Sequence, residues 1–231
     1  MKHKAVAIIP VRGGSKRIPR KNLVNLGDKP LTAHSILNAL KSKYLKNSVY
    51  VSTEDKEISK ISNKYGAQVI DRPAELATDT STTLSALKHA VNYLEKSGVE
   101  FDTVVLLQAT CPFRKTSTID AGIEKLWKNW NEYKALFSVR PSKFPPNWLL
   151  KIKNDKLEFI LPNDFSKIRS QDLDDTFDID GVLYVFNKDY LKKTENYPFE
   201  SGATGFIISS KKEALDIDDN EDLKLARYLA K

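Results

Sequence analysis

Strand-like and helix-like segments alternate along most of this chain, and this alternation limits the folds that it can adopt. Apolar residues at helical spacing predict helices near residues 31–40, 54–65, 84–94, 117–129 and 221–230. Short runs with strand character lie before and between them, at residues 6–9, 49–52, 68–70, 104–107, 136–139, 182–186 and 206–209. We therefore expect βα units, in an α/β fold whose largely parallel sheet is covered by helices on both faces.

The length and composition fit one globular domain. At 231 residues, of which 41% are hydrophobic and 29% charged, the chain is long enough for one large domain, 1–231, with a substantial core. No apolar run approaches the length that crosses a bilayer, and no signal-peptide pattern opens the chain. We expect a cytoplasmic protein without a membrane partner. Its one cysteine, Cys111, has no spaced His or Cys partners for zinc, and packing is favoured over a nucleophilic role.

The first predicted strand runs directly into a glycine turn that carries five cations. Residues 8–22 contain Gly13 and Gly14, with the cations Arg12, Lys16, Arg17, Arg20 and Lys21. Adjacent glycines can adopt positive φ, which directs successive N–H groups into one concavity, and the cations supply the charge that a polyphosphate needs. The loop matches neither the P-loop nor the dinucleotide motif. A solvated basic loop is the alternative, but the position beyond the carboxyl end of a buried strand favours a phosphate site.

Charge is distributed unevenly along the chain. Residues 1–50 contain eleven lysines and arginines and one acidic residue, a balance of +10, whereas residues 171–231 contain fourteen acidic and eight basic residues, a balance of −6. Such an asymmetry suits a polyanion bound by one half of the chain and a cation bound by the other. Nucleic acid is the competing polyanion. Because the densest cations occupy a single loop without aromatic residues that stack on bases, we expect no nucleic-acid partner.

Two carboxylates near the end of the chain form a second candidate site. Asp216 and Asp218 are separated by one residue, so both side chains point to the same side of an extended segment. Two carboxylates suit Mg²⁺, which takes its other ligands from phosphate oxygens and water. The alternative is the acidic N-terminus of a helix, and Asp219, Glu221 and Asp222 are expected to serve only that purpose. The phosphate loop in the same chain favours the metal site.

Residues 141–178 interrupt the alternation and predict an arm that leaves the α/β body. The segment contains Pro141, Pro145, Pro146 and Trp148, followed by a polar, hairpin-like stretch at 151–161 around Asn154-Asp155. Exposed tryptophan and phenylalanine on an extended segment are typical of a partner surface, which favours a dimer contact. A lid or a long loop is the alternative.

Motifs along nearly the whole chain resemble those of the CMP-sialic acid synthetase group of cytidylyltransferases, which activate nine-carbon 2-keto sugar acids with CTP. They are the opening loop, Val51-Ser52-Thr53, Arg72-Pro73-Ala74-Glu75-Leu76-Ala77 with Asp79, Leu106-Leu107-Gln108-Ala109-Thr110-Cys111-Pro112-Phe113-Arg114, Gln171 ahead of Gly181, and Asp216-Ile217-Asp218. Each motif alone is weak, but their order along the chain is specific for the family.

The resemblance implies a Rossmann-like, three-layer nucleotidyltransferase fold that usually forms a homodimer through the protruding arm. The opening loop would hold the CTP phosphates, at Arg12, Gly13, Gly14, Ser15, Lys16, Lys21 and Asn22. Arg72 and Thr83 match positions near the cytidine and ribose, and threonine keeps the hydroxyl of the serine more common at position 83. Gln108 and Gln171 match positions that face the sugar acid, and Asp216 with Asp218 matches the carboxylates that bind Mg²⁺.

The chain departs from the family pattern on the sugar side. Asp180 stands where asparagine is common, so an amide donor to the sugar becomes an anionic acceptor, which would change the sugar that is accepted. Ser170 takes a place often held by arginine, and the adjacent Arg169 is then the candidate partner of the substrate carboxylate. The nucleotide side follows the family pattern.

The resemblance also implies the reaction. The anomeric hydroxyl at C2 of the sugar acid would attack the α-phosphorus of CTP in line, which forms the CMP-sugar and releases pyrophosphate. Arg12, Lys16 and Lys21 would stabilise the charge that grows on the leaving group. Mg²⁺ on Asp216 and Asp218 would polarise the α-phosphate, so Asp218 takes part in catalysis and no dedicated protein base is required.

Three other functions remain open on the sequence. A 3-deoxy-manno-octulosonate cytidylyltransferase shares the chemistry, a nucleotidyltransferase for a sugar phosphate shares the fold, and a basic nucleic-acid-binding module belongs to a different class. The sequence also leaves open which nonulosonic acid is the substrate: N-acetylneuraminic, legionaminic, pseudaminic or a close relative. Small substituents are distinguished by pocket shape and a few hydrogen bonds.

Overall fold

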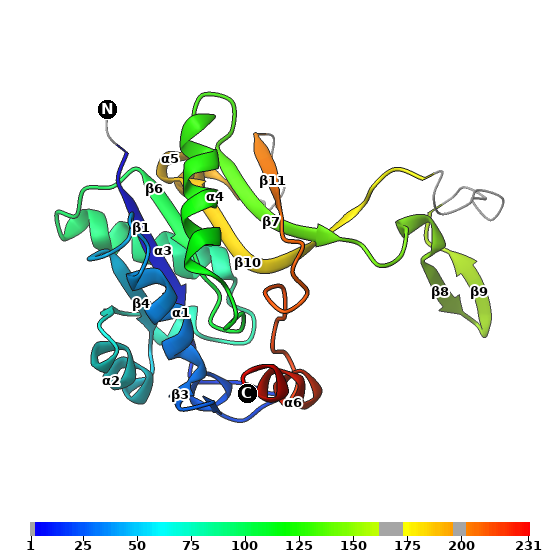
Figure 1. Ribbon diagram of the computed structural model, residues 1–231, viewed down its shortest axis with the longest axis horizontal. Helices are drawn as coiled ribbons and strands as arrows, with labels where there is room; N and C mark the ends of the chain where they lie inside the picture. The colour runs from blue at the N-terminus through cyan, green and yellow to red at the C-terminus, as the bar shows by residue number, and fades with distance from the viewer. Residues whose placement is uncertain (1–2, 162–172, 196–201) are drawn as a thin grey trace.

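A seven-stranded sheet forms the centre of the computed structural model, which describes residues 3–161, 173–195 and 202–231 (Figure 1). The strands lie in the order β11-β7-β10-β6-β1-β4-β5. Their bounds are β1 (Ala5–Pro10), β4 (Val49–Thr53), β5 (Gln68–Asp71), β6 (Thr103–Leu106), β7 (Ala135–Pro141), β10 (Phe177–Asn187) and β11 (Ala203–Ile207). Within the described residues, β10 is the one strand of this sheet that runs antiparallel to its neighbours, so the predicted largely parallel sheet is confirmed.

Helices cover both faces of the sheet. One face packs against α1 (Leu31–Leu40), α2 (Lys56–Lys64) and α4 (Thr116–Lys128), and the other against α3 (Thr83–Lys96) and α5 (Lys188–Lys193). Along β1, Ala7 and Ile9 pack in the apolar core on the face covered by α1, α2 and α4, whereas Val6 and Ile8 pack in the core on the opposite face. Both sides of this strand are therefore buried, which explains its continuous apolar sequence. None of the helices in the described part of the chain has the length and apolarity needed to span a bilayer.

The five predicted helices lie within two residues of their observed bounds, including α6 (Asn220–Leu229) at the C-terminal side. Helix α2 begins at Lys56 because the carboxylate of Asp55 accepts the N–H groups of Glu57 and Ile58 and caps the helix. The sequence did not predict α5, which buries only Leu191 and so lacks an apolar stripe, or the short strands β2 (Asn25–Leu26) and β3 (Lys29–Pro30). Strand β11 also begins three residues earlier than predicted.

The opening loop and the C-terminal segment of the chain pack together below the sheet (Figure 1). Ile18 and Leu31 pack with Ile217 and Leu223 in a small apolar cluster. The Ile217 N–H donates to the carbonyl oxygen of Thr110 at 2.9 Å, which fixes this late segment against the loop that follows β6. Helix α6 then begins with a capping box. The Asp219 side chain accepts the N–H groups of Glu221 and Asp222, and the Asp222 side chain accepts the N–H groups of Asp218 and Asp219. This is the acidic helix N-terminus that the sequence predicts.

The arm is an amphipathic hairpin that extends far from the sheet (Figure 1). Strand β7 leads outward, through the 3₁₀ turn η3 (Pro146–Trp148), to β8 (Leu150–Lys153) and β9 (Lys156–Phe159), which are joined by Asn154 and Asp155 with φ of 50° and 59°. All residues of β8 and β9 are exposed. Their register places every apolar residue on one face and every charged residue on the other. The apolar face consists of Leu150, Ile152, Leu157 and Phe159.

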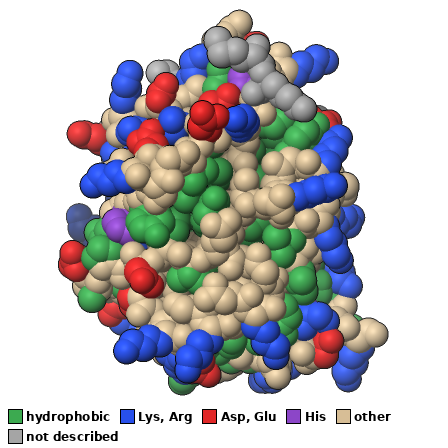
Figure 2. All heavy atoms as spheres, turned by 90° about the vertical axis from the view of Figure 1, so that its left-hand side faces the viewer, with side chains coloured by type: hydrophobic (Ala, Val, Ile, Leu, Met, Phe, Trp, Pro, Cys, Tyr) green, Lys and Arg blue, Asp and Glu red, His purple; other side chains and the backbone are tan. Residues whose placement is uncertain are grey.

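Figure 2 shows the molecule from the side opposite the arm. Lysine and arginine side chains lie around the margin of this face, with acidic side chains among them, and uncharged side chains and backbone occupy most of its centre. Among the described residues, most of the exposed large hydrophobic side chains belong instead to the arm, where Ile152 is 75% and Leu157 68% exposed.

We expect Ile217→Ala to lower the free energy of unfolding by about 2–5 kcal/mol, the usual cost of truncating a fully buried isoleucine. Ile217 is 0% exposed and joins the opening loop to α6. Leu225→Ala is the matched control, since Leu225 lies in α6 with 47% exposure and should change the free energy by less than about 0.5 kcal/mol. Urea unfolding followed by circular dichroism measures both, and equal midpoints would show that the end-to-end contact contributes little.

Candidate active site

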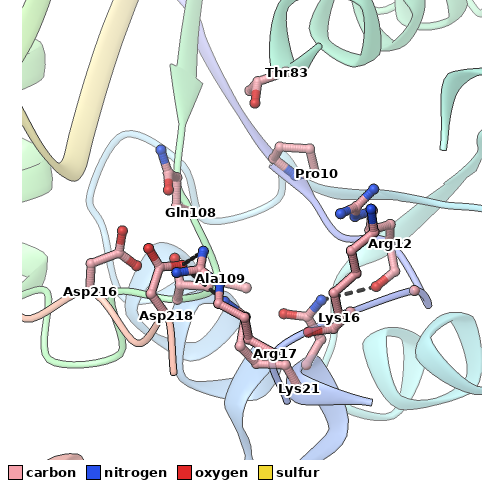
Figure 3. A pocket seen from close by; sticks show the side chains of 14 residues that line it. Pro10, Arg12, Lys16, Arg17, Lys21, Thr83, Gln108, Ala109, Asp216 and Asp218 are labelled. Atoms are coloured by element: carbon pink, nitrogen blue, oxygen red, sulfur yellow. Dashed lines mark hydrogen bonds and ion pairs between the residues drawn. The ribbon is translucent and has the colours of Figure 1, made fainter. Parts of the chain in front are cut away.

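A cavity of about 480 Å³ lies at the carboxyl ends of β1 and β6 (Figure 3). The chain leaves β1 toward β4 on one side and later returns to β6 on the other, so this is the point where the strand order reverses. The volume falls within the range of small-molecule sites. The lining residues are Pro10, Arg12, Gly14, Ser15, Lys16, Arg17, Lys21, Asn22, Thr83, Gln108, Ala109, Thr110, Asp216 and Asp218.

The opening loop is shaped by a close approach rather than by the predicted glycine conformations. Neither Gly13 nor Gly14 has a positive φ, and the left-handed residue of the loop is Arg20, with φ of 54°. A Cβ at position 13 would lie 2.4 Å from Asp55 Oδ2, so glycine is needed there because the loop presses against the β4–α2 turn. The side chain of Asn22 donates to the Arg12 carbonyl oxygen at 3.0 Å and closes the loop on itself.

Arg20 pairs with Asp55 and Glu57 beside the loop, and the other four loop cations form two pairs, each of which shares a carboxylate at the cavity. Lys21 Nζ donates to the Ile217 carbonyl oxygen at 2.7 Å and lies 3.4 Å from Asp218 Oδ1, while Arg17 Nη2 lies 3.0 Å from the same oxygen. On the opposite side of the cavity, Arg12 and Lys16 pair with Asp79 at 3.0 and 2.8 Å (Figure 3). The ammonium of Lys16, together with Arg12, holds the pKa of Asp79 below its usual value.

The structure brings Asp216 and Asp218 to one side of the cavity, as their spacing predicts (Figure 3). The intervening Ile217 is buried, and its bond to Thr110 turns both carboxylates toward the cavity. Burial raises the pKa of Asp216, and the charge of Asp218 adds to this effect. Oδ1 of Asp216 is buried and has no hydrogen-bond partner among the described residues. A carboxylate oxygen in this state is suited to a cation.

These two carboxylates fit Mg²⁺ only if other ligands complete its coordination. No group of three or more His, Cys, Asp or Glu side chains in the described ranges could hold a metal ion. Mg²⁺ is commonly bound in this way, by one or two carboxylates together with substrate phosphates and water. The donor set therefore suits an ion that arrives with a phosphate ligand.

Gln108 lines the cavity above the two aspartates and is held from below by Arg114. Arg114 is 1% exposed and donates to the Gln108 carbonyl oxygen at 2.8 Å, to Ser35 Oγ at 3.1 Å and to the carbonyl oxygen of Val182. Gly181, with φ of +74°, passes so close that a Cβ there would lie 3.3 Å from Gln108 Oε1. The guanidinium thus joins α1, the β6 loop and β10 beneath the site.

Asp180 lies beneath the cavity surface rather than on it. It is 4% exposed and does not line the cavity. Its Oδ1 accepts the Ser138 hydroxyl and, at 3.0 Å, the Val182 N–H, where β10 bends and its register with β7 shifts. Burial raises the pKa of Asp180, and its Oδ2 has no hydrogen-bond partner among the described residues. Any effect of Asp180 on a ligand therefore passes through Gly181 and Gln108.

A second cavity of about 290 Å³ adjoins the first and shares Pro10, Arg12 and Thr83 with it. Arg72 lines only this second cavity. Thr83 is the first residue of α3 and follows Thr82, whose hydroxyl caps the helix by accepting the Ser85 N–H at 3.1 Å. The arginine and threonine that the sequence assigned to the nucleoside are therefore placed together, next to the loop assigned to the phosphates.

The remaining residues singled out from the sequence are Arg169, Gln171, Cys111 and Gly13. Arg169 and Gln171 lie outside the described residues. Cys111 is fully buried, and burial raises the pKa of its thiol to about 12, which agrees with a packing role. Gly13 does not line the main cavity, because its N–H donates to Glu54 Oε1. The sequence assignments omitted Arg17, although it belongs to the same cationic loop and reaches the same aspartate as Lys21.

The chain is similar to known proteins over nearly its whole length. The chain is 34% identical over 227 residues to CMP-N,N'-diacetyllegionaminic acid synthase of Legionella pneumophila. The match covers 97% of this chain and 95% of that relative. It is 32% identical over 226 residues to N-acylneuraminate cytidylyltransferase of Escherichia coli. That match covers 98% of this chain but only 52%, about half, of the longer relative.

A solved structure and a family model extend the comparison. The structure of CMP:2-keto-3-deoxy-manno-octonic acid synthetase complexed with CTP has a TM-score of 0.72 over 98% of both chains, which at 18% identity shows a shared fold. A family model described as cytidylyltransferase matches residues 6–230. This match includes both the cationic opening loop and the late aspartates, and the chain belongs to the cytidylyltransferase family.

Proposed function

We propose that this protein transfers the cytidylyl group of CTP to a nonulosonic acid, a nine-carbon 2-keto sugar acid, and releases pyrophosphate. The main support for the proposal is that the opening-loop cations line the same cavity as Asp216 and Asp218. The loop cations suit a triphosphate, and the two carboxylates, which lie beside Lys21 and Arg17, suit its divalent counter-ion. The names of the two relatives, which specify N-acylneuraminate and diacetyllegionaminic acid, support this sugar class.

The two cavities suggest how the substrates divide between them. The second cavity, with Arg72 and Thr83, would take the cytidine and ribose. The triphosphate would then extend past Arg12, which lines both cavities, toward Lys21. Gln108 would face the sugar acid near the α-phosphate. This order follows from the shared lining residues, because the nucleotide must cross from one cavity to the other.

Among the loop cations, Lys21 is best placed to act on the transition state. Its side chain is 13% exposed, whereas that of Lys16 is 75% exposed. Electrostatic interactions are stronger where water is excluded, so a fixed ammonium at Lys21 stabilises the charge that develops during in-line attack more than a solvated one does. Lys16 and Arg12, which lie on the other side of the cavity, would serve mainly to bind the triphosphate.

The carboxylates would hold the metal ion. Asp216 and Asp218 would each supply an oxygen to Mg²⁺, with the remaining ligands from the nucleotide and water. Bound there, the ion would polarise the α-phosphate and favour ionisation of the attacking hydroxyl. The surrounding residues orient the carboxylates: the Ile217 N–H bond to Thr110 sets their direction, and Arg17 with Lys21 neutralises Asp218.

A substrate panel tests the proposal directly. Pyrophosphate release would be measured with N-acetylneuraminic, legionaminic and pseudaminic acids, with 3-deoxy-manno-octulosonate and with a sugar phosphate, each offered with CTP or another nucleoside triphosphate and Mg²⁺. We expect turnover with CTP and at least one nine-carbon acid. Turnover only with the eight-carbon acid, or only with a phosphorylated acceptor, would contradict the proposal.

Lys21→Ala should lower kcat by about 10²- to 10³-fold, which is the usual cost of removing one preorganised charge-stabilising group. The reason is the loss of a nearly buried ammonium at the leaving group. Lys29→Ala is the control, because Lys29 pairs only with the exposed Asp28 outside the cavity. Pyrophosphate release at saturating CTP measures both variants, and near-wild-type turnover of Lys21→Ala would remove this residue from the mechanism.

Asp218→Ala should also lower kcat by about 10²- to 10³-fold and should raise the Mg²⁺ concentration needed for half-maximal rate. The substitution removes one of two carboxylates and leaves Arg17 and Lys21 without their partner. Glu221→Gln serves as the control, since Glu221 is an exposed residue of the same segment. An unchanged Mg²⁺ dependence would place the metal elsewhere.

We propose further that the protein acts in the cytoplasm as a homodimer formed through the arm. A two-stranded hairpin is marginally stable alone, and β8 and β9 expose a complete apolar face. A second copy of the chain supplies an identical apolar face, which can pair with the first about a two-fold axis. The family resemblance supports the same assembly.

Ile152→Asp should convert the dimer to a monomer at micromolar concentration without unfolding the α/β body. The residue is 75% exposed and lies on the apolar face of the hairpin, so a charge there opposes association but disturbs no core contact. Lys153→Glu, on the charged face, is the control. Light scattering after size exclusion measures the mass, and a wild-type chain that is already monomeric would contradict the assembly.

A further inference from the structure

Glu54 lies between two parts of the nucleotide site, and none of the chemistry above uses it. It follows β4 directly, and its side chain is 22% exposed. Oε1 accepts the Gly13 N–H at 2.7 Å, and Oε2 accepts Arg72 Nη2 at 2.8 Å. One carboxylate therefore binds the loop assigned to the phosphates and the arginine assigned to the nucleoside, which are far apart in the sequence.

Arg72 depends on this contact for its charge balance. Its side chain is only 5% exposed, and Nη2 also donates to the Val11 carbonyl oxygen at 2.8 Å. Glu54 is the carboxylate that lies within ion-pair distance of it. The buried Nε has no hydrogen-bond partner among the described residues, although Arg72 lines the second cavity. A buried guanidinium that loses its carboxylate is left with an uncompensated charge, which is costly.

The opening loop depends on the same turn. The N–H of Gly13 is directed to Glu54 and away from the cavity, and position 13 packs so closely on Asp55 that no side chain fits. The next residue on one side, Arg12, lines both cavities, and the next on the other, Gly14, lines the main one. Holding Gly13 thus sets where the cationic part of the loop begins.

We propose that Glu54 is a positioning residue, which fixes the opening loop and Arg72 relative to each other and so sets the affinity for the nucleotide. The inference rests on the proposed function, because it assumes that both elements contact CTP. Glu54 touches neither cavity. Its loss would weaken binding in the ground state and the transition state alike, which raises the KM for CTP and leaves kcat nearly unchanged.

The experiment compares Glu54→Ala and Glu54→Gln with the wild type. We expect Glu54→Ala to raise the KM for CTP and the Kd for CTP without sugar by about 10- to 100-fold, by analogy with the loss of a residue that orients a metal ligand. The KM for the sugar acid should change little, because Gln108 lies in a different loop. Glu54→Gln keeps an oxygen acceptor of the same length and should recover part of the affinity.

Glu57→Gln is the matched control. Glu57 belongs to the same turn, but it pairs only with Arg20 at the surface and lines neither cavity. Its KM for CTP should equal that of the wild type. If Glu54→Ala melts at a lower temperature, its weaker CTP binding could reflect lost stability, and Glu54→Gln is then the variant to compare. A folded Glu54→Gln variant with weakened CTP affinity supports the proposal.

Two results would overturn the inference. One is an unchanged Kd for CTP in a folded Glu54 variant, and the other is a loss of kcat without a change in KM. A parallel titration with inorganic triphosphate distinguishes failure of the Glu54 proposal from failure of the proposed function. A wild type that binds triphosphate but not CTP would refute the proposed function, and weaker triphosphate binding by Glu54→Ala would still show that Glu54 positions the loop.

Discussion

The contact between the opening loop and the segment 216–218 determines where this protein can bind a ligand. Lys21 donates to the backbone of Ile217 and approaches Asp218, while the side chain of Ile217 is buried against Ile18 and Leu31. Apolar burial provides the stability of this contact, and the ion pairs set its register. Because the cations and the carboxylates come from opposite ends of the chain, the cavity exists only when these ends are packed together.

Most of the fold followed from local patterns. The buried strands and amphipathic helices have strong apolar patterns, so their positions were predicted within three residues, except that β10 begins five residues earlier than predicted. The direction of β10 was not predictable, because an antiparallel strand buried on both faces has the same apolar sequence as a parallel one. Helix α5 escaped prediction since it buries one residue, and the hairpin's division into apolar and charged faces becomes clear only from its register.

The site was predicted more fully for its charged groups than for the residues that support them. Spacing alone placed Asp216 and Asp218 on one side, and the loop composition identified the cations. Glu54 and Arg114 have no local signal, because their roles arise from hydrogen bonds to segments distant in sequence. Gly13 was singled out for backbone freedom, whereas the structure requires it for the close approach of Asp55. Asp180 was expected at the sugar, but it lies beneath the surface.

The distance in sequence between the two halves of the cavity also affects how the chain matures during synthesis. The contact between Lys21 and Ile217 joins residues 196 positions apart. At roughly 5–20 residues per second, the ribosome needs about 10–40 seconds to reach Ile217 after it has added Lys21. During that interval the sheet from β1 to β6 can form, while Lys21 and Arg17 have no carboxylate to meet and Ile18 has no covering side chain. The cavity is therefore incomplete in a nascent chain until translation has passed residues 216–218.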